Sequence, residues 1–146
     1  SAQPFELFGA PFIETEKVIE ILGGNLLPGA ILRPAVFEPT SNKWKGVACN
    51  GFQIHVTDPW EYQPYITTIR LLQVICLLYK DTFKWKHPPY EYEYSRLPID
   101  LIIGDQKIRR RIEEFDEIDN IAESWQEGLD AFTNISREFY LYEPRV

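Results

Sequence analysis

Several residue types are scarce in this sequence, and each absence narrows the kinds of site that the chain can hold. Histidine and cysteine occur only twice each among 146 residues, as His55, His87, Cys49 and Cys76, at unrelated places. These residues form no metal-ligand pattern, so we expect no metal site. Cys76 lies in an apolar helical pattern and is expected to be a buried thiol, whereas the sequence leaves open whether the cysteines pair.

Methionine is absent altogether. Because a complete reading frame begins with methionine, we expect the chain to be a processed product or a piece of a longer protein. Its first residues show neither the basic start nor the apolar stretch of a signal peptide. The longest apolar run, 69–79, contains Arg70 and Gln73 and is too short to span a bilayer. A glycine-rich phosphate loop is missing as well, and we expect no cofactor.

Basic residues are fewer than acidic residues in the sequence. There are 15 lysines and arginines against 22 aspartates and glutamates, which gives a formal net charge of −7. A nucleic-acid partner requires a basic patch that displaces counterions, and an anionic membrane surface attracts basic segments. We therefore expect no nucleic-acid partner and no membrane insertion.

The sequence does contain ample material for a packed core, with 45% hydrophobic and 14% aromatic residues. We expect a single domain over 1–146. The apolar periodicity and turn residues predict strands at 5–8, 28–40, 51–57 and 138–142 with a short aromatic strand within 84–98, and helices at 11–22, 64–79, 105–115 and 116–135. Pro34 interrupts its strand or places it at an edge. The pattern indicates the α+β class, with a small mixed, mostly antiparallel sheet packed with three to five helices.

The strand over 51–57 has an unusual polar side. Its sequence "GFQIHVT" places Phe52, Ile54 and Val56 on one side and Gln53, His55 and Thr57 on the other. Solvent-facing strand positions more often carry Lys, Glu or Ser. This polar row therefore faces water, another part of the protein, or a ligand.

Several single residues could take part in catalysis or binding, but each also has an ordinary structural interpretation. His55 could act as an acid, base or hydrogen-bond donor, but its spacing alone favours a structural histidine. Arg33 and Arg96 could each hold an anionic group by two hydrogen bonds. An internal ion pair with Glu38 or Asp100 is at least as good an interpretation.

The remaining candidates are carboxylates, aromatic residues and an arginine run. Glu38 and Asp58 each precede a proline and Asp100 lies two residues after one, and for Asp58 turn chemistry is favoured over glycoside hydrolysis. Trp44 lies in a polar loop between two lysines, where a flat ring can serve as a platform for a sugar. The run 109–111 is expected to be the solvated face of a helix. The last helix carries Leu129 and Phe132 in an apolar stripe that is expected to face the core.

Four segments in the same order resemble one bacterial family. They are "PFELFGAPFIE", "LPGAILRPAVFEPTSNKWKG", "GFQIHVTD" and "RLPIDLIIG", followed by "SWQEGLDAF" and "FYLY". Together they are similar to the C-terminal domain of NamZ-like exo-β-N-acetylmuramidases, and the resemblance covers essentially the whole chain. Val36 stands where the family often has tyrosine, Ser41 where it has an aromatic residue, and Asn50 where glycine is common. These departures concern substrate preference more than membership.

The resemblance implies a glycoside hydrolase that releases N-acetylmuramic acid from the non-reducing end of peptidoglycan fragments. Family members have an N-terminal Rossmann-like domain with the presumed catalytic glutamate, and the substrate cleft lies between the two domains. This chain resembles only the second domain, so it would contain no catalytic residue and would be inactive alone. A periplasmic or secreted location is expected, with turnover of recycled fragments in the cytoplasm as the alternative.

The family's motifs fall on 33–34, 53–58 and 96–101 of this chain. The residues expected to bind substrate or to orient the catalytic domain are Gln53, His55, Thr57, Arg33, Arg96 and Trp44. Two other classes of function stay open: a stand-alone carbohydrate or cell-wall binding module, and a structural or assembly domain. The sequence does not distinguish a retaining from an inverting mechanism, and it does not give the oligomeric state.

Overall fold

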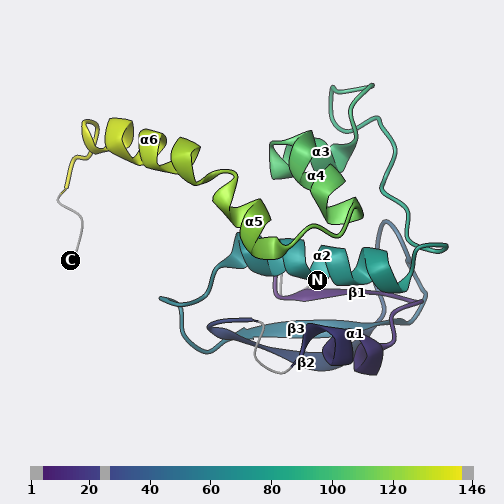
Figure 1. Cartoon of the computed structure of the whole chain (residues 1–146). Coiled ribbons are helices and arrows are strands. Elements are labelled where there is room, and N and C mark those ends of the chain that lie inside the picture. The colour runs from purple at the N-terminus through teal and green to yellow at the C-terminus, as the bar shows by residue number, and fades with distance from the viewer. Residues whose placement is uncertain (1–4, 24–26, 143–146) are drawn as a thin grey trace. The chain divides into compact units, whose positions relative to one another are not determined.

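The computed structural model describes residues 5–23 and 27–142 (Figure 1). The chain divides into two compact units, residues 1–115 and 116–146. The expectation of one domain over the whole chain stays a prediction. Within the described residues, no helix is both long enough and apolar enough to cross a membrane.

The first unit contains an antiparallel sheet of three strands, β1 (Leu7–Ala10), β2 (Ala30–Phe37) and β3 (Cys49–Val56), in the order β1-β3-β2. The strand β3 is therefore central and β2 lies at an edge, where Pro34 costs no ladder hydrogen bond on its outer side. The α+β class and the antiparallel sheet are confirmed. The first strand is shifted by two residues from the range that the sequence predicts.

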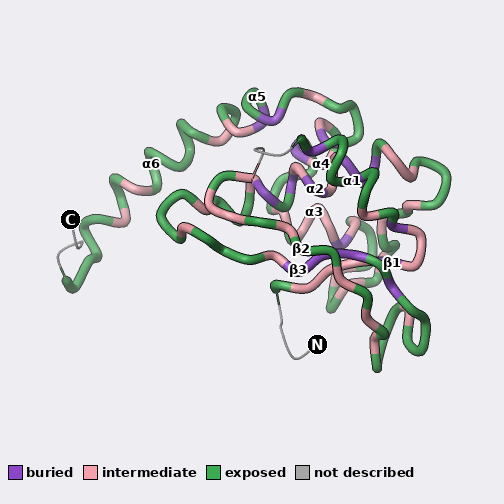
Figure 2. Tube along the Cα trace, turned by 90° about the horizontal axis from the view of Figure 1, so that it is seen from below, coloured by how far each residue is buried: buried purple, intermediate pink, exposed green. Residues whose placement is uncertain are grey.

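The core forms where helices α1 (Thr15–Leu22) and α2 (Pro64–Leu78) cover one side of β3. Phe52 is fully buried there. Its neighbours in the core cluster include Ala10, Val18, Leu22, Leu71, Val74 and Ile75. Figure 2 shows buried positions along both α2 and β3. Helix α2 begins at a proline, as the sequence predicts, because a first-turn position needs no N–H donor.

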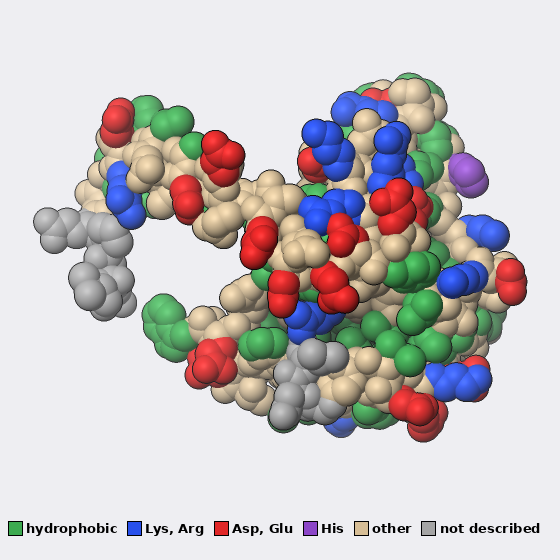
Figure 3. All heavy atoms as spheres, viewed as in Figure 1, with side chains coloured by type: hydrophobic (Ala, Val, Ile, Leu, Met, Phe, Trp, Pro, Cys, Tyr) green, Lys and Arg blue, Asp and Glu red, His purple; other side chains and the backbone are tan. Residues whose placement is uncertain are grey.

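Two short helices complete the first unit, α3 (Pro98–Ile103) and α4 (Gln106–Glu113). The Asp105 side chain accepts a hydrogen bond from the backbone N–H of Lys107 at 2.7 Å and caps α4, which confirms the helix predicted at 105–115. Gly104 ends α3 in the left-handed region (φ 89°). Helix α3 was not predicted, because six residues are too few to show periodicity. Acidic and basic side chains are interspersed over these helices (Figure 3).

The prediction of an aromatic strand within 84–98 is wrong. Among the described residues, this segment forms only an isolated bridge between Tyr90 and Glu93. Both of their backbone hydrogen bonds close a local turn, at 2.9 and 3.0 Å, so the segment does not pair with the sheet. Tyr92 and Tyr94 remain exposed.

The second unit contains helices α5 (Ile118–Glu123) and α6 (Gln126–Arg137). The prediction of one continuous helix over 116–135 is therefore wrong, because the helix is interrupted at 124–125. At this point Ser124 Oγ donates a hydrogen bond to the carbonyl of Ile121 at 2.6 Å. The N-cap residue of α5 is Glu117. The predicted strand at 138–142 is also wrong, because the N–H groups of residues 138–140 bond back to carbonyls three residues earlier and prolong the helix as turns.

The apolar stripe predicted for the last helix is only partly buried. Ile118 and Ile121 of α5 are buried. Leu129 and Phe132 of α6 are exposed, Phe132 to 67%. The helical spacing was correct, but the expectation that these two side chains face the core is wrong in this structure.

Candidate functional site

The strand register brings part of the predicted polar row together with an arginine. Gln53 of β3 lies opposite Arg33 of β2, and His55 lies opposite Ile31. Side chains at paired positions project from the same face of a sheet, and successive residues along a strand project from opposite faces. Arg33, Gln53 and His55 therefore share the face of the sheet opposite to the buried Phe52. From here on, the polar row means these three residues, in which Arg33 takes the place that the sequence pattern gives to Thr57.

A chain of hydrogen bonds fixes the centre of the polar row. The Arg33 guanidinium donates to Gln53 Oε1, and Gln53 Nε2 donates to Glu6 Oε2 at 3.4 Å. Gln53 is only 6% exposed, whereas Arg33 is exposed. A buried amide is costly unless it is bonded, and here both of its ends have partners. The Gln53 amide thus orients Arg33 and leaves further N–H donors of its guanidinium toward solvent.

His55 and Thr57 differ from Gln53 in that both are exposed. Neither side chain forms a hydrogen bond within the described residues, while the backbone N–H of Thr57 donates to the carbonyl of Gly29 at 2.8 Å. An exposed position agrees with the ordinary interpretation of His55 as a surface histidine, although no structural hydrogen bond holds its ring within the described part of the chain. The His55 imidazole is accessible to a ligand or to another protein surface.

Arg96 does not join the polar row. Its Nε pairs with Glu93 Oε2 at 2.9 Å within the loop that precedes α3. Ser95 also donates to Glu93 Oε1, from Oγ at 2.6 Å and from the backbone N–H at 2.8 Å. These bonds from Ser95 and then from Arg96 lower the pKa of Glu93 to about 2. The arginine therefore serves to close its own loop.

The Glu93 carboxyl is expected to titrate near pH 2, which carbon-13 NMR of the side chain would measure. Because the pKa in the folded state lies below the ordinary value of 4.5, the stability that these contacts contribute is complete above about pH 4.5 and is lost as the pH falls toward 2. Ser95→Ala removes the hydroxyl donor and should raise the midpoint. A wild-type midpoint near 4.5 would contradict this hydrogen-bond arrangement.

Trp44 also lies apart from the polar row. It occupies the loop between β2 and β3, with its ring edge-on to Phe12 at a centroid distance of 6.4 Å. The Lys43 ammonium lies 5.1 Å from the centre of the Trp44 indole ring. Both residues line a surface hollow, and no member of the polar row lines it.

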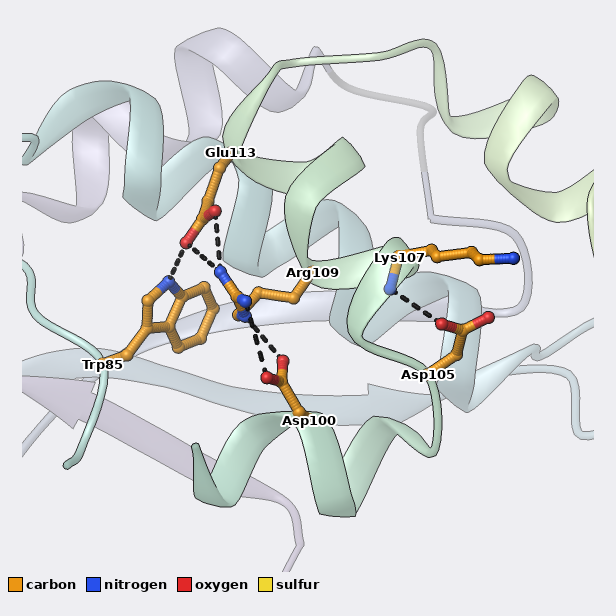
Figure 4. A network of polar contacts seen from close by, with 6 residues as sticks. All are labelled: Trp85, Asp100, Asp105, Lys107, Arg109 and Glu113. Carbon is orange, nitrogen blue, oxygen red and sulfur yellow. Dashed lines mark hydrogen bonds and ion pairs between the residues drawn. The ribbon is translucent and has the colours of Figure 1, made fainter. Parts of the chain in front are cut away.

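The expectation that Arg109 lies on a solvated helix face is wrong. Figure 4 shows this arginine between Asp100 of α3 and Glu113 of α4. The distances are 2.5 Å from Nε to Asp100 Oδ1 and 2.9 Å from a terminal nitrogen to Glu113. Trp85 Nε1 donates to Glu113 Oε1 at 2.7 Å. The Asp100 hydrogen bond is the main reason why the pKa of Arg109 is raised. This network joins a loop to two helices, and a charge run read without tertiary contacts gives no sign of it.

The Asp58 carboxylate has a structural environment. Asp58 Oδ1 accepts from the backbone N–H of Trp60 at 2.8 Å, which agrees with the predicted turn chemistry. The internal pairs considered for Arg33 and Arg96 with Glu38 or Asp100 are not formed.

Both cysteines are free and buried, and burial raises the pKa of Cys76 to about 11. Within the described ranges, no three His, Cys, Asp or Glu residues cluster in a way that could hold a metal ion.

Comparisons with known proteins agree on one family. The family model for the C-terminal domain of the exo-beta-N-acetylmuramidase NamZ matches residues 1–142. The peptidoglycan beta-N-acetylmuramidase NamZ of Bacillus subtilis (strain 168) is 32% identical over 142 residues, which are 97% of this chain and 32% of that protein. A crystal structure of a DUF1343 family protein from Bacteroides fragilis superposes with a TM-score of 0.77 at 28% identity, over 96% of this chain and 36% of that one.

The chain thus spans about a third of the length of each of these relatives. Both matches cover nearly all of its own length, and the family model extends from β1 through α6. The chain belongs to the family of the C-terminal domain of the exo-β-N-acetylmuramidase NamZ.

Proposed function

We propose that this chain forms one wall of the substrate cleft of a peptidoglycan-degrading glycoside hydrolase. The enzyme would release N-acetylmuramic acid from the non-reducing ends of peptidoglycan fragments. The family supports this substrate, since the B. subtilis relative is described as a peptidoglycan β-N-acetylmuramidase. The catalytic glutamate would belong to a separate N-terminal domain of the same polypeptide, because the chain corresponds to only 32% of that relative. The proposed location is the periplasm or the cell exterior.

The observation that carries the proposal is the polar row on the sheet face opposite the core. N-acetylmuramic acid carries an acetamido group and a lactyl carboxylate, so its recognition requires amide partners and a cation. Arg33 can pair with a carboxylate through two parallel N–H bonds, and Gln53 holds it in place. The exposed imidazole of His55 can bond a sugar hydroxyl or the acetamido group. These residues would position the substrate, while proton transfer belongs to the other domain.

The alternative role of the same row is contact with the catalytic domain alone. Gln53 already has partners at both ends of its amide, as a residue of a rigid interface would. In that case Arg33 and His55 would bond to protein groups instead of to sugar. The two roles predict different dependence on the lactyl carboxylate of the substrate, and this difference can be measured.

The test uses the full-length protein that carries this chain, with a chromogenic N-acetylmuramide and the matching N-acetylglucosaminide, which lacks the lactyl group. Arg33→Ala is expected to lower kcat/KM on the muramide by roughly 10- to 100-fold, the value of one or two charge-assisted hydrogen bonds. Its effect on the glucosaminide should be much smaller. His55→Ala should cost about tenfold on both substrates, since its partner is present in both.

The matched control is Arg110→Ala, which removes an exposed arginine from α4. It should leave both activities unchanged, and the chain alone should release no sugar. Equal losses on the two substrates for Arg33→Ala would favour the interface role. Wild-type activity in both the Arg33 and His55 variants would show that the polar row does not contact substrate. An inactive full-length protein would overturn the substrate assignment itself.

A further inference from the structure

A second surface feature of the first unit has the composition of a small-molecule site. A hollow of about 530 Å³ lies beside β1, the turn that follows it, the β2–β3 loop and the end of α2. Its lining includes the aromatic rings of Phe12, Trp44 and Phe83 together with the ammonium-bearing chains of Lys43 and Lys84. The volume falls within the range of about 300–1,000 Å³ that is typical of ligand sites.

The charge of this hollow is opposite to the charge of the chain. The chain has a formal net charge of −7, yet two lysines and no aspartate or glutamate line the hollow. Lys43 and Lys84 come from segments far apart in the sequence, and both are exposed. Within residues 5–23 and 27–142, neither lysine has a carboxylate partner. Two unneutralised cations at one apolar hollow indicate an anionic ligand.

In the β2–β3 loop, the backbone of Trp44 has an unusual conformation. Trp44 has φ 66°, in the left-handed region that a bulky residue rarely adopts. Backbone hydrogen bonds close the loop around it, from Val47 N–H to the Trp44 carbonyl at 2.9 Å and from Gly46 N–H to the Pro39 carbonyl at 3.0 Å. The loop therefore keeps the indole ring and the Lys43 ammonium together at the hollow.

We propose that this hollow binds a carboxylate-bearing sugar, with the carboxylate between Lys43 and Lys84 and the apolar side of the sugar ring against the aromatic lining. The choice of an acidic amino sugar rests on the proposed function. The hollow is separate from the polar row, since Arg33, Gln53 and His55 do not line it. It would thus be a second subsite, which holds a part of the peptidoglycan fragment other than the residue at the polar row.

The experiment titrates the 146-residue chain with N-acetylmuramic acid and follows amide and indole resonances by NMR. Saturable shifts are expected at the Trp44 indole and at Lys43 and Lys84, and they should weaken as salt is added. N-acetylglucosamine, which has no carboxylate, should bind at least tenfold more weakly. Trp44→Asn should abolish the response, and it is a suitable variant because asparagine tolerates a positive φ.

Matched lysine variants separate local binding from net charge. Lys43→Gln and Lys84→Gln should each weaken binding by about fivefold to tenfold, whereas Lys45→Gln and Lys86→Gln should not, since these neighbouring lysines do not line the hollow. The inference is overturned if all four variants behave alike, if the neutral sugar binds equally well, or if no saturable shift appears at the hollow.

The Arg33→Ala variant distinguishes this inference from the proposed function. Binding at the hollow should be unchanged in that variant. Shifts confined to the polar row, and lost in Arg33→Ala, would overturn the hollow as a subsite while leaving the cleft-wall role in place. Binding at the hollow by a chain whose full-length protein is inactive on muramides would support the site and overturn the enzyme assignment.

Discussion

Gly51→Ala is expected to lower the free energy of unfolding by about 3 kcal/mol or more, at the upper end of the cost of overpacking. Gly51 of β3 lies opposite Gly9 of β1. A Cβ atom added at Gly51 would come within 2.0 Å of the Phe8 carbonyl oxygen and 2.5 Å of Gly9 Cα. Because both obstacles are backbone atoms, no side-chain rotation relieves the clash. The strands must separate, and among the described strands β1 pairs with β3 alone.

Denaturant unfolding measures this loss, and amide hydrogen exchange locates it. Exchange should accelerate first in β1, whose hydrogen bonds depend on the close approach of the two strands. Gly9→Ala should act in the same direction, since its Cβ would meet the Asn50 carbonyl oxygen at 2.4 Å. The double variant should cost less than the sum of the two, because either substitution alone already separates the strands.

Gly128→Ala is the matched control for this prediction. Gly128 lies inside α6 with nothing within 4 Å of an added Cβ, so alanine should stabilise the helix by up to about 1 kcal/mol. An unchanged unfolding midpoint for Gly51→Ala would show that β1 does not pair with β3 in this register.

Arg109→Ala is expected to destabilise the protein by about 3 kcal/mol, the lower end of the range for breaking a buried ion pair. The side chains of Arg109 and Asp100 are only 13% and 8% exposed. Without the guanidinium, the Asp100 carboxylate stays buried with its charge unpaired, and Glu113 loses one of its donors. The loss of stability reflects the unpaired, buried charge of Asp100 more than the attraction between the original partners.

Chemical denaturation of the variant and of suitable controls tests this interpretation. Arg110→Ala, which removes an exposed neighbour on the same helix, should change stability by less than about 0.5 kcal/mol. The double variant Arg109→Met, Asp100→Leu should recover much of the loss, since apolar replacement of a whole buried pair is often nearly neutral. Equal stability of Arg109→Ala and Arg110→Ala would mean that the network in Figure 4 does not form in solution.

Features that depend on residues close together in the sequence could be predicted from the sequence. Helix α2 begins at Pro64 and the alternation in β3 places Phe52 in the core, as expected, and α4 lies within the predicted range 105–115, where Asp105 caps it. Each of these depends on a proline ring, a side chain two residues from its partner, or a period of two. The segments that resemble the NamZ family likewise led to the correct family. The predicted strands at 84–98 and 138–142 failed because a strand requires a partner strand, and aromatic residues by themselves do not supply one.

Only the tertiary structure decided which of these residues meet. The antiparallel register brings Arg33 to Gln53, and the chain path places Arg109 between two carboxylates and Trp44 in a hollow with two lysines. Composition and spacing alone therefore determined an acidic α+β chain with a polar strand face. Its candidate subsites depend on contacts between residues 20 or more positions apart. The energies of these contacts are set by burial and pairing, and such contacts produce no periodic pattern in the sequence.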